Sequence, residues 1–348
     1  MPNLWKYVLP AVHKRVSDDC NPAVKRIGIV GTGDIVRTLH LPVLLNSPKV
    51  RVAWVADRDR SRAEAVGRAF RVPMVPLPED ISKLPHSDVV LIATPLGSRD
   101  IYLESLKERA LYVEKPFSRS GEHHRRICGL FSPNRLACGF QRRCFAPTIL
   151  VKELIETQPF GLLRSIDFGW GGRGFVVGSG YVGNLQLSGG GVLLDNAIHG
   201  LDLVLFVCGA RTTSLRSVQM RIDNGFDIHT RAEIEIMGDS IGAVPFRIHV
   251  SCLEETTNRF DFRFEHAVVR WSTTSPGVFV KPNKGDNWQL LSPPAGRCYP
   301  TNSVQTSFQF WKTYLIGLDA AGANLTSAIS SVLTTELIEA LYQSGGAQ

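Results

Sequence analysis

Short apolar runs alternate with glycine turns and helical segments over the first part of the chain. From Arg26 the order is RIGIV, the turn and helix GTGDIVRTLHLPVLL, the run VRVAWVAD, and a polar helix through SRAEAVGRAF; DVVLIATP and ALYVEKP continue the series. Strands that are apolar throughout are typical of a parallel sheet covered on both faces. The pattern predicts a doubly wound α/β domain over residues 25–142.

The pattern changes in residues 143–322. FAPTILVKELIET predicts a helix, LLRSIDFGW predicts a strand, and later segments alternate apolar and polar residues with period two. We expect an α+β domain whose mostly antiparallel, open sheet has one buried face, followed by a closing helix from about Ser327 to Tyr342 in the C-terminal segment 323–348. The alternating apolar positions are Ala232, Ile234 and Ile236, then Phe246, Ile248 and Val250, then Phe260, Phe262 and Phe264.

Residues 1–24 are expected to form a separate N-terminal arm, either a short amphipathic helix or a frayed terminus. They contain no signal-peptide core, and no apolar run approaches the roughly 18 residues that span a membrane. The 39 basic and 32 acidic residues are scattered, without the basic blocks of nucleic-acid binders. We therefore expect no membrane and no nucleic-acid partner.

The seven cysteines are odd in number and include no CxxC pair, so neither a disulfide framework nor a zinc site is indicated. We expect a cytoplasmic protein and no metal site. The length of 348 residues, with 44% hydrophobic residues, suffices for two cores.

Gly31-Thr32-Gly33 follows the first strand and opens a helix at Asp34 and Ile35. This is half of a dinucleotide fingerprint, in which glycines let the backbone approach a pyrophosphate at a helix N-terminus. The third glycine is replaced by Val36. Asp57 ends the second strand, near the distance of about 20 residues at which an acid bonds the adenosine ribose.

An acid at this place favours NAD over NADP, because a 2′-phosphate would meet a carboxylate. Arg58 keeps NADP open as the alternative, since its guanidinium can neutralise a phosphate. The simpler interpretations are a strand-end cap for Asp57 and a surface charge for Arg58. Thr94 and Pro95 close a later strand at the carboxyl edge of the sheet, where such sheets bind ligands, or simply form a turn.

Two further segments carry ionisable groups. Glu114 and Lys115 end the strand before Pro116, at the same edge of the sheet, although a strand-end lysine is usually solvated. In the run GGGVLLDNAIHGLDLV, the residues Asp195, His199 and Asp202 stand at i, i+4 and i+7, on one face of a predicted helix. That face indicates a cleft or, alternatively, a satisfied structural pair.

Taken together, GTGDIVRTLHLP, ADRDRSRA, ATP, VEKP, GFQRR and GGGVLLDNAIHGLD, in this order and spacing, resemble the Gfo/Idh/MocA family of oxidoreductases. The resemblance covers most of the chain from about Lys25 to the closing helix. It implies a Rossmann domain, NAD or NADP, a sugar, inositol or related polyol as substrate, and a homodimer or homotetramer.

The resemblance also implies roles. Lys115, Asp195 and His199 would line the site beside the nicotinamide and contact the substrate. His199 would be the general base for the hydroxyl proton, Asp195 would orient the imidazole or hold the hydroxyl, and Lys115 would stabilise negative charge on oxygen. The whole predicted cofactor set is Gly31, Thr32, Gly33, Asp34, Ile35, Asp57, Arg58, Thr94, Pro95, Glu114, Lys115 and Gln141.

Arg143 is a further predicted substrate contact, and Asp202 is expected to be structural. Weaker candidates for substrate choice are Arg173, Tyr181 and Asn184. We expect His123 and His124 to be solvated on a charged helix. The chain departs from the family at Val36 and at Gly97-Ser98-Arg99-Asp100, where many members carry a histidine.

These observations predict an NAD(P)-dependent oxidoreductase that transfers a hydride between nicotinamide and a secondary hydroxyl or ketone. Two alternatives stay open. The first is a redox-neutral enzyme that oxidises a sugar transiently so that elimination or glycosidic cleavage can follow. The second is a regulator that binds the dinucleotide without catalysis.

Overall fold

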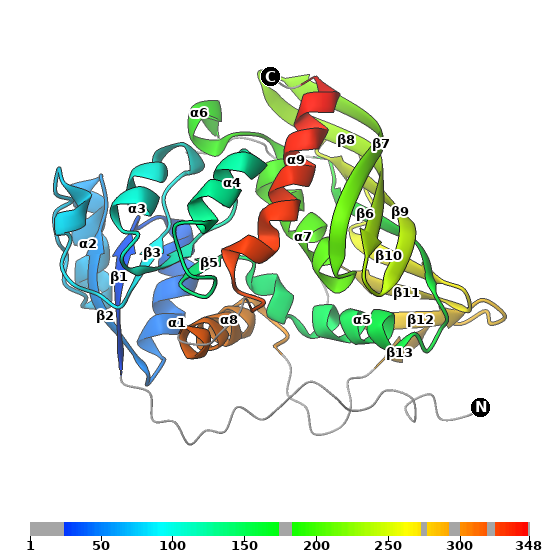
Figure 1. Cartoon of the computed structure of the whole chain (residues 1–348), viewed down its shortest axis with the longest axis horizontal. Coiled ribbons are helices and arrows are strands. Elements are labelled where there is room, and N and C mark those ends of the chain that lie inside the picture. The colour runs from blue at the N-terminus through cyan, green and yellow to red at the C-terminus, as the bar shows by residue number, and fades with distance from the viewer. Residues whose placement is uncertain (1–23, 174–182, 273–276, 292–299, 319–323, 347–348) are drawn as a thin grey trace. The chain divides into compact units, whose positions relative to one another are not determined.

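The computed structural model describes residues 24–173, 183–272, 277–291, 300–318 and 324–346 (Figure 1). These residues form two compact units. Residues 24–141 and 303–335 make up one, and residues 142–302 and 336–346 make up the other. We call them the Rossmann unit and the sheet unit. The predicted arm and Tyr181 lie outside the described residues.

The Rossmann unit contains a five-stranded parallel sheet in the order β2-β1-β3-β4-β5. The predicted parallel sheet is confirmed, and the apolar runs are buried as expected: every residue of β3 and β4 is buried. The chain reverses its direction of winding between β1 and β3, the place where such sheets bind ligands. The strands are β1 (Lys25–Val30), β2 (Val50–Ala56), β3 (Val89–Ile92), β4 (Ala110–Val113) and β5 (Leu136–Cys138).

Helices α1 (Leu41–Leu45), α2 (Arg60–Phe70), α3 (Asp100–Ser105), α4 (Gly121–Cys128) and α8 (Ser303–Gly317) complete this unit. The placement of α8 differs from the predicted boundaries, which put residues 303–322 in the second domain. The buried Trp311 side chain donates to His40, and the Tyr314 hydroxyl donates to the carbonyls of Leu111 and Arg135. These bonds join α8 to the Rossmann unit.

The sheet unit is built on an eight-stranded sheet in the order β13-β12-β11-β10-β6-β9-β8-β7. Among the described strands of this second sheet, only the β6–β9 pair is parallel, so the predicted mostly antiparallel sheet is confirmed. The strands are β6 (Leu163–Gly171), β7 (Ala210–Asp223), β8 (Phe226–Gly238), β9 (Ile241–Ser251), β10 (Arg259–Phe264), β11 (Ala267–Ser272), β12 (Val278–Pro282) and β13 (Gln289–Leu291).

The helices of this unit include α5 (Ala146–Thr157), α6 (Leu185–Ser188) and α7 (Ile198–Val207). The closing helix α9 (Val332–Gly345) begins in the Rossmann unit and ends in the sheet unit. Helix α5 covers the predicted FAPTILVKELIET segment, and it begins with Pro147 in its first turn, where the missing N–H of proline costs nothing.

The period-two pattern of the sheet is confirmed. The nine predicted inward positions on β8, β9 and β10 are all buried, with at most 7% exposure. Their neighbours carry charge: Arg247 and Arg263 both bond Asp167 on the opposite face. One side of the sheet is therefore a core surface, and the other carries ion pairs.

Helix α7 lies against β6 with very little space. A Cβ added at Gly200 would lie 2.1 Å from Cζ of Phe168, whose ring stacks on Phe260 at 4.5 Å. Because that ring is held on both sides, it cannot move away. Glycine at this position lets the helix carrying the predicted catalytic residues approach the sheet.

Within the described residues, no single helix is long and apolar enough to cross a membrane; only the pair Leu185–Asp195 and Ile198–Val207, bent by 53°, reaches the required length and composition together. The five described cysteines are all free thiols.

Replacing Gly200 by alanine should destabilise the protein by about 1–3 kcal/mol, the cost of overpacking a core. The better helix propensity of alanine, about 1 kcal/mol, offsets only part of this strain. Urea unfolding of Gly200→Ala would measure it. Gly242→Ala is the control, because a Cβ at Gly242 would meet no atom within 4 Å. Equal midpoints for both variants would contradict the close α7–β6 contact.

Candidate functional site

The glycine loop after β1 is fixed against two neighbouring strand ends. Gly31 has φ +92°, and a Cβ there would lie 2.4 Å from the carbonyl oxygen of Ala93, so only glycine fits. Thr32 donates to Asp57 Oδ2 through its backbone N–H at 2.7 Å and its hydroxyl at 2.8 Å. The Asp57 carboxylate therefore holds the loop in place.

The surroundings of this loop fit a dinucleotide. A Cβ at Gly33 would meet no atom within 4 Å, so there is open space beside its backbone. Two buried polar atoms, Thr94 Oγ1 and Gln141 Oε1, have no hydrogen-bond partner among the described residues. Buried polar atoms without partners are unusual, and a bound ligand is one explanation for them.

The missing third glycine coincides with an irregular helix. Val36 is fully buried and begins a π-helical segment, Val36–His40, that continues into α1. Asp34 is exposed and pairs with Arg37, and Ile35 is 38% exposed. Arg58 is also exposed. The regular helix expected after the glycine loop is therefore corrected to a π turn followed by an α turn.

Arg99, which the sequence marked only as part of a departure from the family, is the main structural cation at this sheet edge. Its side chain is buried, and it donates to the carbonyls of Thr94 and Glu114 at 2.6 Å each and to that of Pro116. Hydrogen bonds from a buried charged donor are among the stronger ones in proteins. Arg99 thereby joins the ends of β3 and β4, including the cis peptide at Lys115–Pro116.

A chain of buried groups holds the backbone of Lys115. Trp311 Nε1–H donates to His40 Nδ1 at 3.1 Å, and His40 Nε2 lies 2.8 Å from Glu114 Oε1. Because indole is only a donor, Nδ1 must accept, so the proton is on Nε2 and points to the carboxylate. Glu114 Oε2 accepts from the Lys115 N–H at 3.2 Å. The buried carboxylate of Glu114 therefore positions Lys115, and its predicted cofactor contact stays a prediction.

In the sheet unit, a separate structural constraint favours glycine at each of three consecutive positions. Gly189 ends α6 at φ +87°. A Cβ at Gly190 would lie 2.2 Å from the Tyr342 hydroxyl, and one at Gly191 would lie 2.1 Å from the carbonyl of Asp227. These contacts bring the chain close to β8 and α9 just before the helix that carries Asp195 and His199.

Asp227 anchors the start of that helix. Its carboxylate accepts from the N–H groups of Gly191 at 2.6 Å and Leu193 at 2.8 Å, and from the Tyr342 hydroxyl at 2.6 Å. Burial raises the pKa of Asp227 above its ordinary value, although these donors act in the opposite direction. An acceptor at the first turn satisfies N–H groups that have no partner within the helix.

The predicted regular helix through Asp195, His199 and Asp202 is corrected by the structure. Residues Leu193–Ala197 form a π turn, and α7 begins only at Ile198. Asp195 is half-buried in the π turn, His199 is 7% exposed in the first turn of α7, and Asp202 is fully buried. Single π turns inside helices are frequent at functional sites.

Arg143 is committed to Asp202 rather than to open space. Its Nε donates to Asp202 Oδ2 at 2.8 Å and its Nη2 donates to Oδ1, and both side chains are buried. Its guanidinium also lies 5.0 Å from the centre of the Phe206 ring. Arg143 and Asp202 thus form a buried ion pair, and the predicted substrate contact of Arg143 stays a prediction.

The two neighbouring histidines of α4, His123 and His124, differ in burial. His124, expected to be solvated, is fully buried: its ring stacks on Phe117 at 4.0 Å and bonds Thr335 at 2.8 Å. It lies on α4 in line with the buried Gly121 and Ile127.

His123 is more exposed and lies 3.6 Å from Asp100. Asn184 caps α6, accepting from the N–H of Leu187, and the N–H of Arg173 donates to Glu255. Asn184 and Arg173 therefore make structural contacts of a helix cap and a loop.

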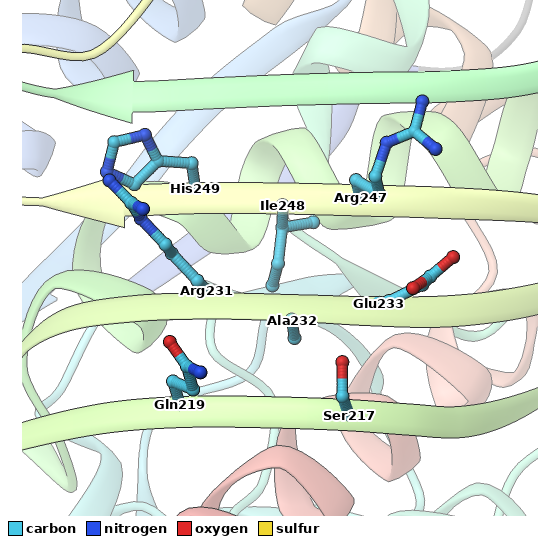
Figure 2. Close-up of a pocket in the computed structure, with 8 residues that line it drawn as sticks. All are labelled: Ser217, Gln219, Arg231, Ala232, Glu233, Arg247, Ile248 and His249. Atoms are coloured by element: carbon cyan, nitrogen blue, oxygen red, sulfur yellow. The ribbon is translucent and has the colours of Figure 1, made fainter.

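A hollow of about 510 Å³ lies on the charged face of the sheet unit (Figure 2), and no predicted site residue lines it. It is open to one side and bordered by long polar side chains of β7, β8 and β9. The residues that line the hollow are Ser217, Gln219, Arg231, Ala232, Glu233, Arg247, Ile248 and His249.

The comparisons with known proteins agree with this description. The model of the GFO_IDH_MocA oxidoreductase family, an NAD-binding Rossmann fold, matches residues 25–138. Residues 25–138 therefore match the Gfo/Idh/MocA family, as the motifs predicted. The chain is 24% identical over 207 residues to the scyllo-inositol 2-dehydrogenase (NAD(+)) of Bacillus subtilis, a match that covers 58% of this chain and 59% of that enzyme. The match thus spans little more than half of that relative.

Solved structures share the whole fold. A levoglucosan dehydrogenase in complex with NADH and L-sorbose has a TM-score of 0.78 at 14% identity, over 93% of this chain and 97% of that chain. KijD10, a 3-ketoreductase from Actinomadura kijaniata in complex with NADP and TDP-benzene, has a TM-score of 0.73 at 16% identity, over 93% and 98%. Both units of the chain therefore share the fold of these solved structures.

Replacing Tyr342 by phenylalanine should lower the free energy of unfolding by about 1–2 kcal/mol, because the buried Asp227 carboxylate loses one of its three donors. Chemical denaturation would measure the change. Gln343→Ala, an exposed change on the same helix, is the control. If Tyr342→Phe cost no more stability than Gln343→Ala, the anchoring role of this hydrogen bond would be refuted.

Proposed function

We propose that this protein is an NAD(P)-dependent oxidoreductase that acts on a secondary hydroxyl or ketone of a sugar, inositol or related polyol, with NAD as the preferred cofactor. The observation that carries the proposal is the edge of the Rossmann sheet. There the open space at Gly33 and the buried atoms Thr94 Oγ1 and Gln141 Oε1 adjoin a strand end that carries Lys115.

The residues that would hold the dinucleotide are those of the glycine loop, with Thr94 and Gln141. When bound, the nicotinamide ring supplies the hydride acceptor or donor. His199 takes the hydroxyl proton during oxidation, and Asp195 orients its imidazole or holds the hydroxyl. The Lys115 ammonium stabilises negative charge on the substrate oxygen. In reduction these roles reverse.

The rigid surroundings of the Lys115 backbone support a chemical role for its side chain. The backbone of this residue is held by Glu114 and the neighbouring carbonyls by Arg99, and both of these side chains are buried. A group held by rigid surroundings loses little freedom when the reaction proceeds. Buried charged groups are expensive, so their presence around one lysine favours function over chance.

Lys115→Met and His199→Asn should each reduce kcat by about 10²–10⁴-fold, the usual effect of losing charge stabilisation or general acid–base catalysis. The assay is NADH or NADPH formation against a panel of inositols, sugars and sugar alcohols. Dinucleotide affinity, measured by calorimetry, should persist in His199→Asn. Lys284→Met and His86→Asn, at exposed positions, are the matched controls.

If Lys115 and His199 act in the same reaction, the fold-loss of kcat in the double variant should be smaller than the product of the two single fold-losses. Two outcomes would overturn the proposal. Product formation without accumulated NADH, with solvent deuterium entering a neighbouring carbon, indicates a redox-neutral enzyme. Tight dinucleotide binding without turnover on any substrate indicates a regulator.

Asp57→Asn should lower the preference for NAD over NADP by about tenfold, or about 1.4 kcal/mol, because the negative charge that disfavours a 2′-phosphate is removed. Dissociation constants for both dinucleotides would be measured by calorimetry. Arg58→Ala tests the alternative. NADP would be the cofactor if Arg58→Ala lost more affinity for NADP than for NAD while Asp57→Asn left the preference unchanged. A cytoplasmic location and a homodimer or homotetramer stay predictions.

A further inference from the structure

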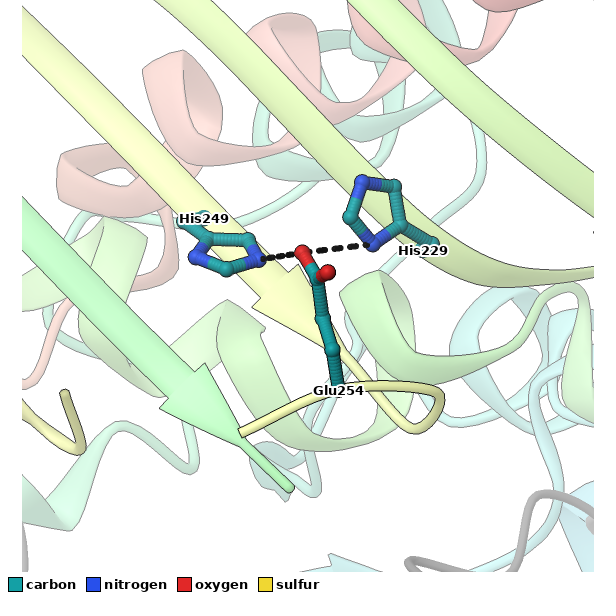
Figure 3. A group of neighbouring side chains, drawn as sticks. All are labelled: His229, His249 and Glu254. Carbon is teal, nitrogen blue, oxygen red and sulfur yellow. Dashed lines mark ion pairs between the residues drawn. The ribbon is translucent and has the colours of Figure 1, made fainter. Parts of the chain in front are cut away.

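Two histidines and a glutamate meet on the charged face of the sheet unit (Figure 3). His229 on β8 pairs with Ser251 on β9, and His249 stands two residues before Ser251, so the two histidines are diagonal neighbours on one face. Glu254 comes from the chain just after β9 and brings its carboxylate back to both rings. These three residues, the His229 cluster, come from two strands and a loop.

The spacing of the three donor atoms suits a metal ion. Glu254 Oε1 lies 2.8 Å from His249 Nε2 and 3.7 Å from His229 Nδ1, and all three ligand atoms lie within 4.8 Å of one another. Tetrahedral bonds of 2.0–2.1 Å to zinc would separate donor atoms by roughly 3.4 Å. The two distances from the carboxylate lie on either side of this value.

Each imidazole nitrogen of the cluster has a polar neighbour close by. The Ser251 hydroxyl accepts from the N–H groups of Leu253 and Glu254 and lies 3.1 Å from His229 Nδ1. Because this nitrogen has one lone pair, a bound metal ion would displace the hydroxyl from it. His249 Nε2 is buried and lies 2.8 Å from Glu254 Oε1.

The Glu254 carboxylate attracts a cation placed between it and the two imidazole rings. In this structure Arg231 supplies positive charge, because its Nη2 donates to Glu254 Oε1 at 2.5 Å. Its side chain is 54% exposed, so it is free to turn into solvent. Arg231 is therefore a competitor for the same carboxylate oxygen, and not a permanent part of the cluster.

We propose that His229, His249 and Glu254 bind a divalent transition-metal ion of the zinc class, with solvent completing its coordination. Two imidazole nitrogens and one carboxylate oxygen suit zinc, cobalt or nickel, whereas magnesium and calcium prefer oxygen donors alone. The cluster shares no residue with the predicted catalytic set of Lys115, Asp195 and His199. The sequence predicted no metal site, because its cysteines form no metal-binding motif and these three ligands lie on two strands and a loop.

The test uses the full-length protein dialysed against chelator. Calorimetry should show saturable Zn²⁺ binding with one site per chain, and Co²⁺ should give the intense visible absorption of a low-coordinate site. His249→Ala and Glu254→Gln should each weaken Zn²⁺ binding by about 100-fold, as expected for loss of a ligand. His86→Ala, at a histidine outside the cluster, should bind as the wild type does.

Arg231→Gln makes the test sharper, because removing the competing cation should tighten Zn²⁺ binding by several-fold. A purely structural ion-pair cluster would show the opposite, with lower stability and no gain in metal affinity. Circular dichroism confirms that each variant is folded, and Glu254→Gln preserves the shape of the side chain if His249→Ala does not fold. The proposal is overturned if the wild type shows no saturable binding, or if His249→Ala and Glu254→Gln both bind Zn²⁺ unchanged.

Discussion

The buried guanidinium of Arg99 is the interaction on which the dinucleotide-binding half depends. It satisfies carbonyls at the ends of two neighbouring strands, and these carbonyls flank the loops that carry Thr94 and Lys115. Without it, several backbone acceptors would be buried unpaired, at a cost of about 1–3 kcal/mol each. A single cation thus converts two loose strand ends into a rigid edge, and the glycine loop rests against that edge through Gly31.

In the sheet unit, a buried carboxylate pairs backbone groups in the way that Arg99 does in the Rossmann unit. Asp227 gathers the N–H groups at the start of the helix that contains His199, and the adjacent glycines leave room for that approach. The π turn that follows changes which side chains face one another, so Asp195 and His199 are not related as residues of a regular helix. In both units a buried charge fixes backbone groups, and the predicted catalytic side chains extend from those fixed segments.

Hydrophobic periodicity predicted most of the fold, because a strand or helix that buries one face needs many apolar residues at fixed spacing. The phenylalanines of β10 and the continuous runs of β3 and β4 are examples. Glycine spacing predicted the loop after β1 equally well, and the cofactor role of Asp57 stays a prediction. Such patterns repeat over several residues, so one exception does not hide them.

Single buried polar residues could not be predicted in this way. His40 acts through residues distant in sequence, and Arg99 acts through carbonyls 5, 15 and 17 positions away, so no local pattern marks either residue. His124 was expected to be solvated because charged neighbours surround it, although the small and apolar residues Gly121 and Ile127, three positions away on either side, indicated a buried stripe. The placement of α8 could not be predicted either, because it depends on the hydrogen bond from Trp311 to the distant His40. Distant partners are visible only in three dimensions.

The pairing of Arg143 with Asp202 has a consequence for how such chains diverge. Both groups are buried, and removing one leaves the other as an uncompensated charge, which costs about 3–5 kcal/mol. Replacing both by apolar residues of similar volume costs far less. Positions 143 and 202 should therefore vary jointly among descendants of a common ancestor, and a chain carrying only one of the two changes would be a poor intermediate.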